Sequence, residues 1–223
     1  MKILALDTAT SRCSVALMAE NDVRELSADA PRVQAETLLP MVEQLLSEAG
    51  LTLASLDAVA FGRGPGAFTG LRVAASVAQG LAFGASLPVL PVSDLAALAA
   101  GAGRLHGARQ VLACMDARMQ ELYWCAYNVE GNSVCPLVPE SLSRPEEVKA
   151  PQEGPWFGAG SGWDAYPVLV GRFTDLSGRD GSLLPAAGDI LRLAAGAFRR
   201  GEAVSPERAQ PVYLRDKVAT PKT

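Results

Sequence analysis

Residues 61–72 read Phe-Gly-Arg-Gly-Pro-Gly-Ala-Phe-Thr-Gly-Leu-Arg, and this stretch decides how the rest of the chain is interpreted. Four of its twelve residues are glycine and one is proline. A strand is predicted before it at residues 56–61 and a helix within and after it at residues 69–83. Glycine adopts positive φ and permits close approach of backbone, whereas proline fixes φ and removes an amide donor. Such a unit either aims N–H groups at an anion or forms a rigid surface for a partner.

The predicted helix at residues 69–83 is apolar around most of its circumference. Its polar side chains, Arg72, Ser76 and Gln79, form one narrow stripe. Such a helix is buried on more than one side, so it is expected to pack on its own sheet and against a second element or a second chain. A neighbouring amphipathic helix is predicted at residues 35–49 and should begin near residue 36 or 37, which leaves Pro40 in its first turn.

A carboxylate followed by a polar turn, with a strand on each side, occurs twice, first at Asp7 and again at Asp116. This weak repeat, with a glycine-rich and loop-like boundary at residues 101–107, predicts two related lobes, residues 1–103 and 104–223. Strands are predicted at residues 2–7, 13–19, 23–28, 87–92, 110–116, 121–128 and 156–162. Helices are predicted at residues 95–100, 145–148 and 186–200, and an extended tail at residues 211–215.

The first of these turns could bind phosphate, because the hydroxyl side chains that follow Asp7 could hold a metal-bound phosphate between two strands. Asp116 with Arg118 would be the matching element of the second lobe. The alternative is that Asp7 ends a strand and the hydroxyls satisfy a turn, with Asp116 and Arg118 in a local ion pair. The candidate residues for a vestigial phosphate site are Asp7, Thr8, Thr10, Ser11, Asp116 and Arg118.

Composition narrows the function classes. The 223 residues are 49% apolar and 20% charged, which is typical of a globular protein with a real core. A formal net charge of −4 does not favour direct binding of nucleic acid, so another subunit would supply most of that affinity. The four cysteines lack C-x-x-C spacing, which predicts reduced thiols in the cytosol. Neither a signal peptide nor a membrane-spanning segment is expected, so a cytoplasmic protein is predicted.

The single histidine, His106, is a strong constraint. It lies in the glycine-rich stretch and is expected on the surface. A metal site built on a histidine pair is impossible, and a Ser-His-Asp or Cys-His site could use only this residue. No metal site is predicted.

The glycine loop and the Asp-Ala-Arg-Met turn at residues 116–119 closely resemble two specific motifs of the TsaB family, also called YeaZ. This family is the non-catalytic partner in bacterial threonylcarbamoyladenosine modification of tRNA. The resemblance runs from the N-terminus to about Arg215. Supporting similarities lie at residues 3–8, 13–17, 160–163, 184–187 and 211–215.

The resemblance implies an α/β, actin-like and Hsp70-like fold of two lobes, each a mixed sheet flanked by helices. It also implies a paralogue, TsaD, that performs the transfer and carries a metal-binding histidine pair just after a Pro-Val. Here Pro91 and Val92 are followed by Ser93 and Asp94, so no Lewis acid would be held. A catalytically silent chain without its own cofactor is expected, with any nucleotide at a subunit interface. One departure is Gln34, where histidine is expected in many members of the family.

The resemblance further implies the partners: TsaD in a heterodimer, TsaE, a homodimer when the chain is alone, tRNA only through the complex, and no membrane. Paired helices of the first lobe would form the contact with TsaD. The residues expected at this interface are Arg63, Gly64, Pro65, Gly66, Phe68, Thr69, Arg72, Ala75, Ser76, Gln79, Leu38 and Val42.

Two alternatives come from other function classes. An independent ATPase or phosphotransferase of the same superfold would use Asp7 and Asp116 around a metal-nucleotide. It is weakened because Asp7 is followed by Thr-Ala-Thr, without the glycine that lets backbone approach phosphate. A peptidase is disfavoured by the single histidine and the absence of a metal motif.

Overall fold

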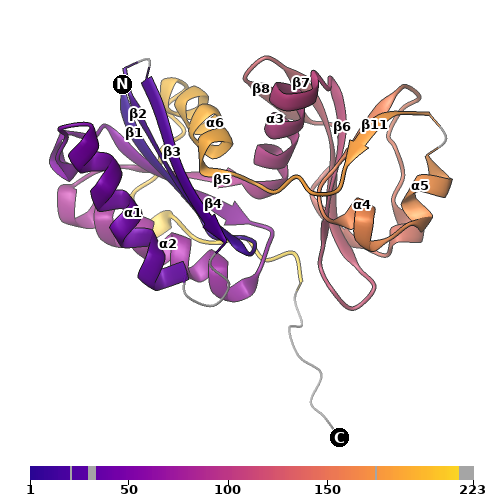
Figure 1. Cartoon of the computed structure of the whole chain (residues 1–223), viewed down its shortest axis with the longest axis horizontal. Coiled ribbons are helices and arrows are strands. Elements are labelled where there is room, and N and C mark those ends of the chain that lie inside the picture. The colour runs from indigo at the N-terminus through magenta and orange to yellow at the C-terminus, as the bar shows by residue number, and fades with distance from the viewer. Residues whose placement is uncertain (21, 30–33, 174, 216–223) are drawn as a thin grey trace, which may run out of the picture.

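Two β-sheets lie side by side, each flanked by helices (Figure 1). The computed structural model describes residues 1–20, 22–29, 34–173 and 175–215. Within these residues, the first sheet has the strand order β3-β2-β1-β4-β5; β2 is antiparallel to β1 and β3, and β4 is parallel to β1 and β5. Its strands are β1 (Lys2–Asp7), β2 (Arg12–Ala19), β3 (Asp22–Asp29), β4 (Ala58–Gly64) and β5 (Val89–Ser93).

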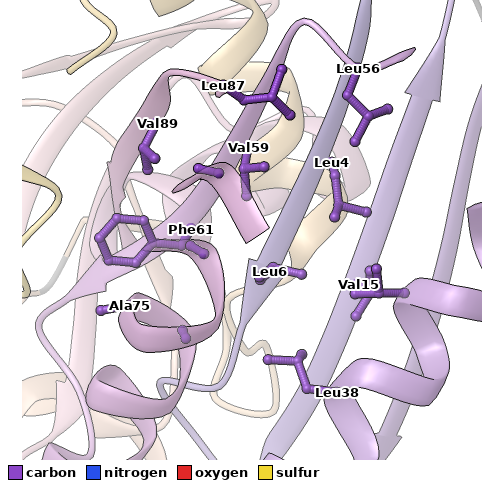
Figure 2. Close-up of a cluster of buried hydrophobic side chains, with 14 of the residues drawn as sticks. Leu4, Leu6, Val15, Leu38, Leu56, Val59, Phe61, Ala75, Leu87 and Val89 are labelled. Carbon is purple, nitrogen blue, oxygen red and sulfur yellow. The ribbon is translucent and has the colours of Figure 1, made fainter. Parts of the chain in front are cut away.

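The helices α1 (Gln34–Glu48) and α2 (Phe68–Ala85) cover one face of the first sheet. Leu4 and Leu6 of β1 and Phe61 of β4 lie in the hydrophobic cluster beneath them (Figure 2). Because β1 is buried on both faces, its sequence is almost continuously apolar rather than alternating.

The start of α1 was predicted too late. The helix begins at residue 34, so Pro40 lies inside it rather than in its first turn. Proline inside a helix costs a hydrogen bond. Leu38, Val42 and Leu45 are buried against the sheet, and this burial offsets the loss.

The helix α6 (Ala187–Arg199) covers the opposite face of the first sheet, although it follows the second sheet in sequence. Ile3 and Ala5, which alternate with the leucines of β1, pack against its Ile190. The division into residues 1–103 and 104–223 stays a prediction, and helices from both parts pack on this sheet.

The second sheet has the strand order β11-β10-β6-β7-β8, with β9 paired to β7. The helix α3 (Asp94–His106) packs on one face, and the short helices α4 (Gly162–Ala165) and α5 (Val168–Arg172) lie over the other. Its strands are β6 (Gln110–Asp116), β7 (Leu122–Glu130), β8 (Ser133–Pro136), β9 (Ser141–Ser143), β10 (Trp156–Ala159) and β11 (Leu176–Asp180). The 3-10 helices are η1 (Leu53–Ser55), η2 (Pro145–Glu147) and η3 (Pro206–Arg208).

The predicted fold class, two lobes with a mixed sheet in each, is confirmed. The glycine-rich stretch at residues 101–107 was wrongly predicted as a loop, because α3 continues to His106. A Cβ at Gly103 would lie 2.6 Å from Val129 Cγ1, and one at Gly101 would lie 3.0 Å from Asp189 Oδ2. These glycines allow close packing of α3. His106 therefore lies in the last turn of α3, hydrogen-bonded to Asp180 at 3.0 Å.

Candidate functional site

The glycine loop after β4 is packed tightly against its own chain. Gly64 has φ +107°, and a Cβ there would lie 2.7 Å from the carbonyl oxygen of Val212. A Cβ at Gly66 would lie 2.6 Å from the carbonyl oxygen of Ala9, which also accepts a 2.8 Å hydrogen bond from Ala67 N–H. Of the two roles open to such a loop, these contacts favour a rigid surface rather than an anion cradle.

The exposed face of α2 carries most of the predicted polar stripe. Phe68, Thr69, Arg72 and Ser76 are exposed, whereas Gln79 is half-buried and donates to the carbonyl oxygen of Ala209 at 3.0 Å. Further along the same helix, Phe83 is 73% exposed. The glycines at positions 80 and 84 are exposed and have no atoms within 4 Å of where a Cβ would stand. We call this exposed face of residues 68–84 the α2 face.

Part of the predicted interface lies inside the protein. Leu38, Val42 and Ala75 are buried in the cluster between α1, α2 and the sheet, and Figure 2 shows Leu38 and Ala75 within it. Gly64 and Pro65 are also buried. The prediction of these five residues as surface contacts is wrong. For Ala75, the sequence does not show which apolar side of a nearly all-apolar helix faces its own sheet. Leu38 and Val42 lie on the apolar face of α1, which packs on that sheet, and the loop at Gly64 is covered by the distant segment at Val212.

Arg63 faces the second lobe rather than the α2 face. Its guanidinium forms a 3.2 Å ion pair with Glu140 Oε2. Glu140 also accepts hydrogen bonds from the hydroxyls of Ser93 and Tyr127. These groups line a pocket of about 720 Å³ between the lobes. Arg63 thus connects the glycine loop to the second lobe.

The C-terminal segment, residues 209–215, crosses from the first lobe to the second (Figure 1). Val212 N–H donates to the carbonyl oxygen of Arg63 at 2.7 Å, and Arg215 forms a 2.7 Å ion pair with Glu121 of the second lobe. Tyr213 lies 5.3 Å from the ring of Phe68 at the start of α2. The sequence predicted an extended tail but missed Tyr213 and Arg215 as site residues. The similarity of residues 211–215 to the TsaB family was the signal that could have identified them.

Arg72 also contacts both Phe68, at the start of α2, and Tyr213 of the C-terminal segment. Its Cζ lies 3.9 Å from the centroid of the Phe68 ring, and its Nε donates to Tyr213 Oη at 3.2 Å. A guanidinium over an aromatic ring is held by a cation–π interaction. The first turn of the α2 face is therefore fixed by the C-terminal segment.

Asp7, at the end of β1, is fully buried and lies against Asp94, the first residue of α3, which is also fully buried. Asp7 Oδ1 accepts from Ala9 N–H at 2.8 Å, and Asp94 Oδ2 accepts from Gly64 N–H at 2.5 Å. A Cβ at Gly62 would collide with both carboxyl groups. Burial raises the pKa of Asp7 to about 6, and burial together with the charge of Asp7 raises the pKa of Asp94 well above its usual range.

The predicted phosphate site is not open at its first element. Asp7 and Thr8 are enclosed by protein, and Thr8 Oγ1 donates to the carbonyl oxygen of Gly70 at 2.7 Å. Thr10 Oγ1 accepts from Arg12 N–H, as in a turn, and Ser11 is exposed. Asp7 therefore ends a strand and, with Thr10, accepts turn N–H groups as in the alternative interpretation, whereas the Thr8 hydroxyl contacts α2 instead of its own turn.

At the second element of the predicted phosphate site the side chains also contact their own chain, although Arg118 is largely exposed. Asp116 accepts a 2.8 Å hydrogen bond from Tyr166 Oη and pairs with Arg118 at 3.0 Å. Arg118, Met119 and Gln120 have φ near +60° and form a left-handed turn. The structure thus shows the local ion pair and turn that were the alternative to a phosphate contact. Among the described residues, no three His, Cys, Asp or Glu side chains converge as metal ligands, and no helix is long and apolar enough to cross a membrane.

Comparison with known proteins identifies the family. The model of the family TsaD, tRNA N6-adenosine threonylcarbamoyltransferase, matches residues 28–159. The tRNA threonylcarbamoyladenosine biosynthesis protein TsaB of Escherichia coli K12 is 45% identical over 227 residues, which cover 100% of this chain and 98% of that protein. The chain belongs to the TsaB family.

Two further comparisons agree with membership of the TsaB family. The TsaB protein of Haemophilus influenzae is 40% identical and covers 100% of this chain, with 97% of that protein matched. The solved structure of YeaZ from Pseudomonas aeruginosa is 48% identical, with a TM-score of 0.88 over 96% of this chain and 99% of that one. The family resemblance and the fold inferred from sequence are confirmed.

Proposed function

We propose that this TsaB-family chain is an accessory subunit that binds and activates TsaD in the threonylcarbamoyladenosine modification of tRNA. The observation that carries the proposal is the α2 face, supported by the family membership reported above. Aromatic and Arg side chains are enriched in protein interfaces, and small residues let a second helix approach closely. The α2 face combines Phe68, Arg72 and Phe83 with Ser76 and two glycines.

The partner in this proposal is TsaD, joined by TsaE, with tRNA held only through the complex. A homodimer through the α2 face would form when the chain is alone, because a helix pair of the same kind would cover that face. The location proposed for this work is the cytoplasm.

The chain is proposed to perform no transfer chemistry. The histidine pair that the catalytic relative is expected to carry just after a Pro-Val is missing after Pro91 and Val92. Asp94 in that stretch is enclosed against Asp7 and the glycine loop. Asp116 and Arg118 are paired with each other. No cofactor of its own is proposed, and a nucleotide would bind at the interface with a partner.

Reconstitution tests the proposal. TsaD, TsaE, the threonylcarbamoyl-adenylate synthase and tRNA would be assayed with and without this chain. We expect modification to require the chain, and the chain alone to show no turnover of magnesium-ATP. Modification that is unchanged without it would overturn the accessory role, and ATP turnover abolished by Asp7→Asn would favour an independent ATPase.

A matched pair of variants tests the α2 face. Gly80→Trp places a large side chain on the α2 face where no atoms lie within 4 Å, and we expect at least a tenfold loss of affinity for TsaD. Gly171→Trp makes the same change in α5, on the outer side of the second lobe, and should bind normally (Figure 1). Equal binding by both variants, measured by calorimetry, would reject the assigned face.

A further inference from the structure

The carboxyl groups of Asp7 and Asp94 lie in one fully enclosed space beneath the glycine loop. One oxygen of each already accepts a backbone N–H, from Ala9 and from Gly64. The other oxygens, Asp7 Oδ2 and Asp94 Oδ1, have no hydrogen-bond donor among the described residues. Two buried acceptors that face no donor are costly unless a proton is supplied.

The surrounding charges do not neutralise the pair. Arg12 on β2 and Arg63 on β4 attract its charge from a distance, and the Cys13 thiol of β2 is also nearby. Among the described side chains, neither arginine donates a hydrogen bond to either carboxyl, and Arg63 pairs instead with Glu140. The start of α3 favours an anion at Asp94, but only with partial charges. Two ionised carboxylates in contact within a dry space would therefore repel without compensation.

We propose that Asp7 and Asp94 hold one proton between them at neutral pH, and that this shared proton keeps the glycine loop seated on the first sheet. The proton gives the two carboxyls a hydrogen bond to each other. Asp94 Oδ2 stays free to accept Gly64 N–H. The single proton thus connects the end of β1, the end of β4 and the start of α3.

Loss of the proton would place two negative charges against Gly62. The carboxyls would move apart, and the hydrogen bond that holds Gly64 would weaken. Because α2 begins four residues after Gly64, the loop carries the start of the α2 face with it. This consequence for partner binding rests on the proposed function, whereas the shared proton does not.

The sign of the pH dependence follows from proton counting. An unfolded chain, with aspartate pKa values of about 3.9, binds no proton at these residues near pH 7. The folded pair binds one, so folding becomes less favourable as pH rises through the folded pKa of Asp94. Between about pH 6, above which Asp7 is ionised, and the folded pKa of Asp94, the pair should lower the folding equilibrium constant about tenfold per pH unit. Above that pKa the dependence should level off.

Infrared spectroscopy of the full chain in D2O tests the proton directly. We expect the carbonyl stretch of a protonated carboxylic acid at neutral pH in the unmodified protein. Asp94→Asn should remove that band and still fold, because its amide can donate to Asp7 and accept from Gly64 N–H. Asp22→Asn, at an exposed ion pair with Arg24, is the matched control and should keep the band.

Denaturant unfolding at a series of pH values gives the second readout. The unmodified protein and Asp22→Asn should share a tenfold-per-unit term that Asp94→Asn lacks. No protonated-carboxyl band in the unmodified protein, or an equal pH slope in all three proteins, would overturn the proposal. If Asp94→Asn does not fold, Asp7→Asn and the unmodified spectrum decide the question. A band without any binding to TsaD would contradict the proposed function and leave the shared proton intact.

Discussion

Phenylalanine can be replaced by alanine at an exposed position, Phe83, and at a buried position, Phe61, and the two substitutions should have different effects. Phe83 is 73% exposed on the α2 face, whereas Phe61 is fully buried beneath α2 (Figure 2). Burying a whole phenylalanine side chain stabilises by about 1.5–3 kcal/mol. A partner that covered the exposed part of Phe83 would therefore gain about 1–2 kcal/mol, so Phe83→Ala should weaken TsaD binding about 5-fold to 30-fold.

The same substitution should leave the stability of the monomer nearly unchanged, within about 0.5 kcal/mol, because little of Phe83 is buried. Phe61→Ala should instead cost about 3–5 kcal/mol, since it removes a core ring and leaves a cavity. Urea unfolding at low protein concentration measures both values without a contribution from self-association.

Two results would refute this reasoning. A loss of more than about 2 kcal/mol in the Phe83→Ala monomer would show that the ring is packed within its own chain. Normal affinity of folded Phe83→Ala for TsaD would show that the partner does not cover this end of α2. Phe61→Ala is the control that confirms the sensitivity of the unfolding measurement.

Two other predictions concern the glycine loop and the thiols. Gly64→Ala should destabilise the protein by about 2–3 kcal/mol, because Gly64 has φ +107° and the new Cβ would lie 2.7 Å from the carbonyl oxygen of Val212. Thermal unfolding measures this loss. An unchanged melting temperature would contradict the close packing of the loop. Cys135 is exposed, whereas burial raises the pKa of the Cys13 thiol to about 11, so a thiol reagent at mildly alkaline pH should modify Cys135 first. Mass spectrometry of the folded protein would show this order, and equal labelling of Cys13 would mean that β2 opens readily.

The sequence predicted correctly those strand and helix ends that depend on residues close together in the chain. The strands β1 and β6 have the predicted bounds, because each is an apolar run that ends at an aspartate and a polar turn. The N-cap of α3 is Ser93, a residue type favoured at that position, and its Oγ accepts from Ala96 N–H at 3.1 Å. The chemistry of a cap or a strand end lies within a few residues, so sequence alone reveals it.

Features set by distant segments were not predictable in the same way. Ala75 looks like any other small residue of α2, and only the position of the sheet makes it a core residue. The glycines of α3 read as a loop until Val129 and Asp189 are seen to approach them. The residues that follow Pro91 and Val92 were interpreted only as lacking a histidine pair, and the contact of Asp94 with Asp7 joins residues far apart in the chain. Tertiary contact overrides local propensity at each of these positions.

The return of α6 to the first sheet affects how the protein is made. The face formed by Ile3, Ala5 and the neighbouring strands is covered mainly by α6, a helix near the other end of the described chain, with Ala97 of α3 at its edge. During synthesis the strands that form this apolar face are made early, and most of the remaining sequence is made before α6, which packs on that face. A fragment limited to residues 1–103 would keep that face open to water and to other chains. The two lobes are therefore expected to reach their final state together, with α6 as the late step that closes the first.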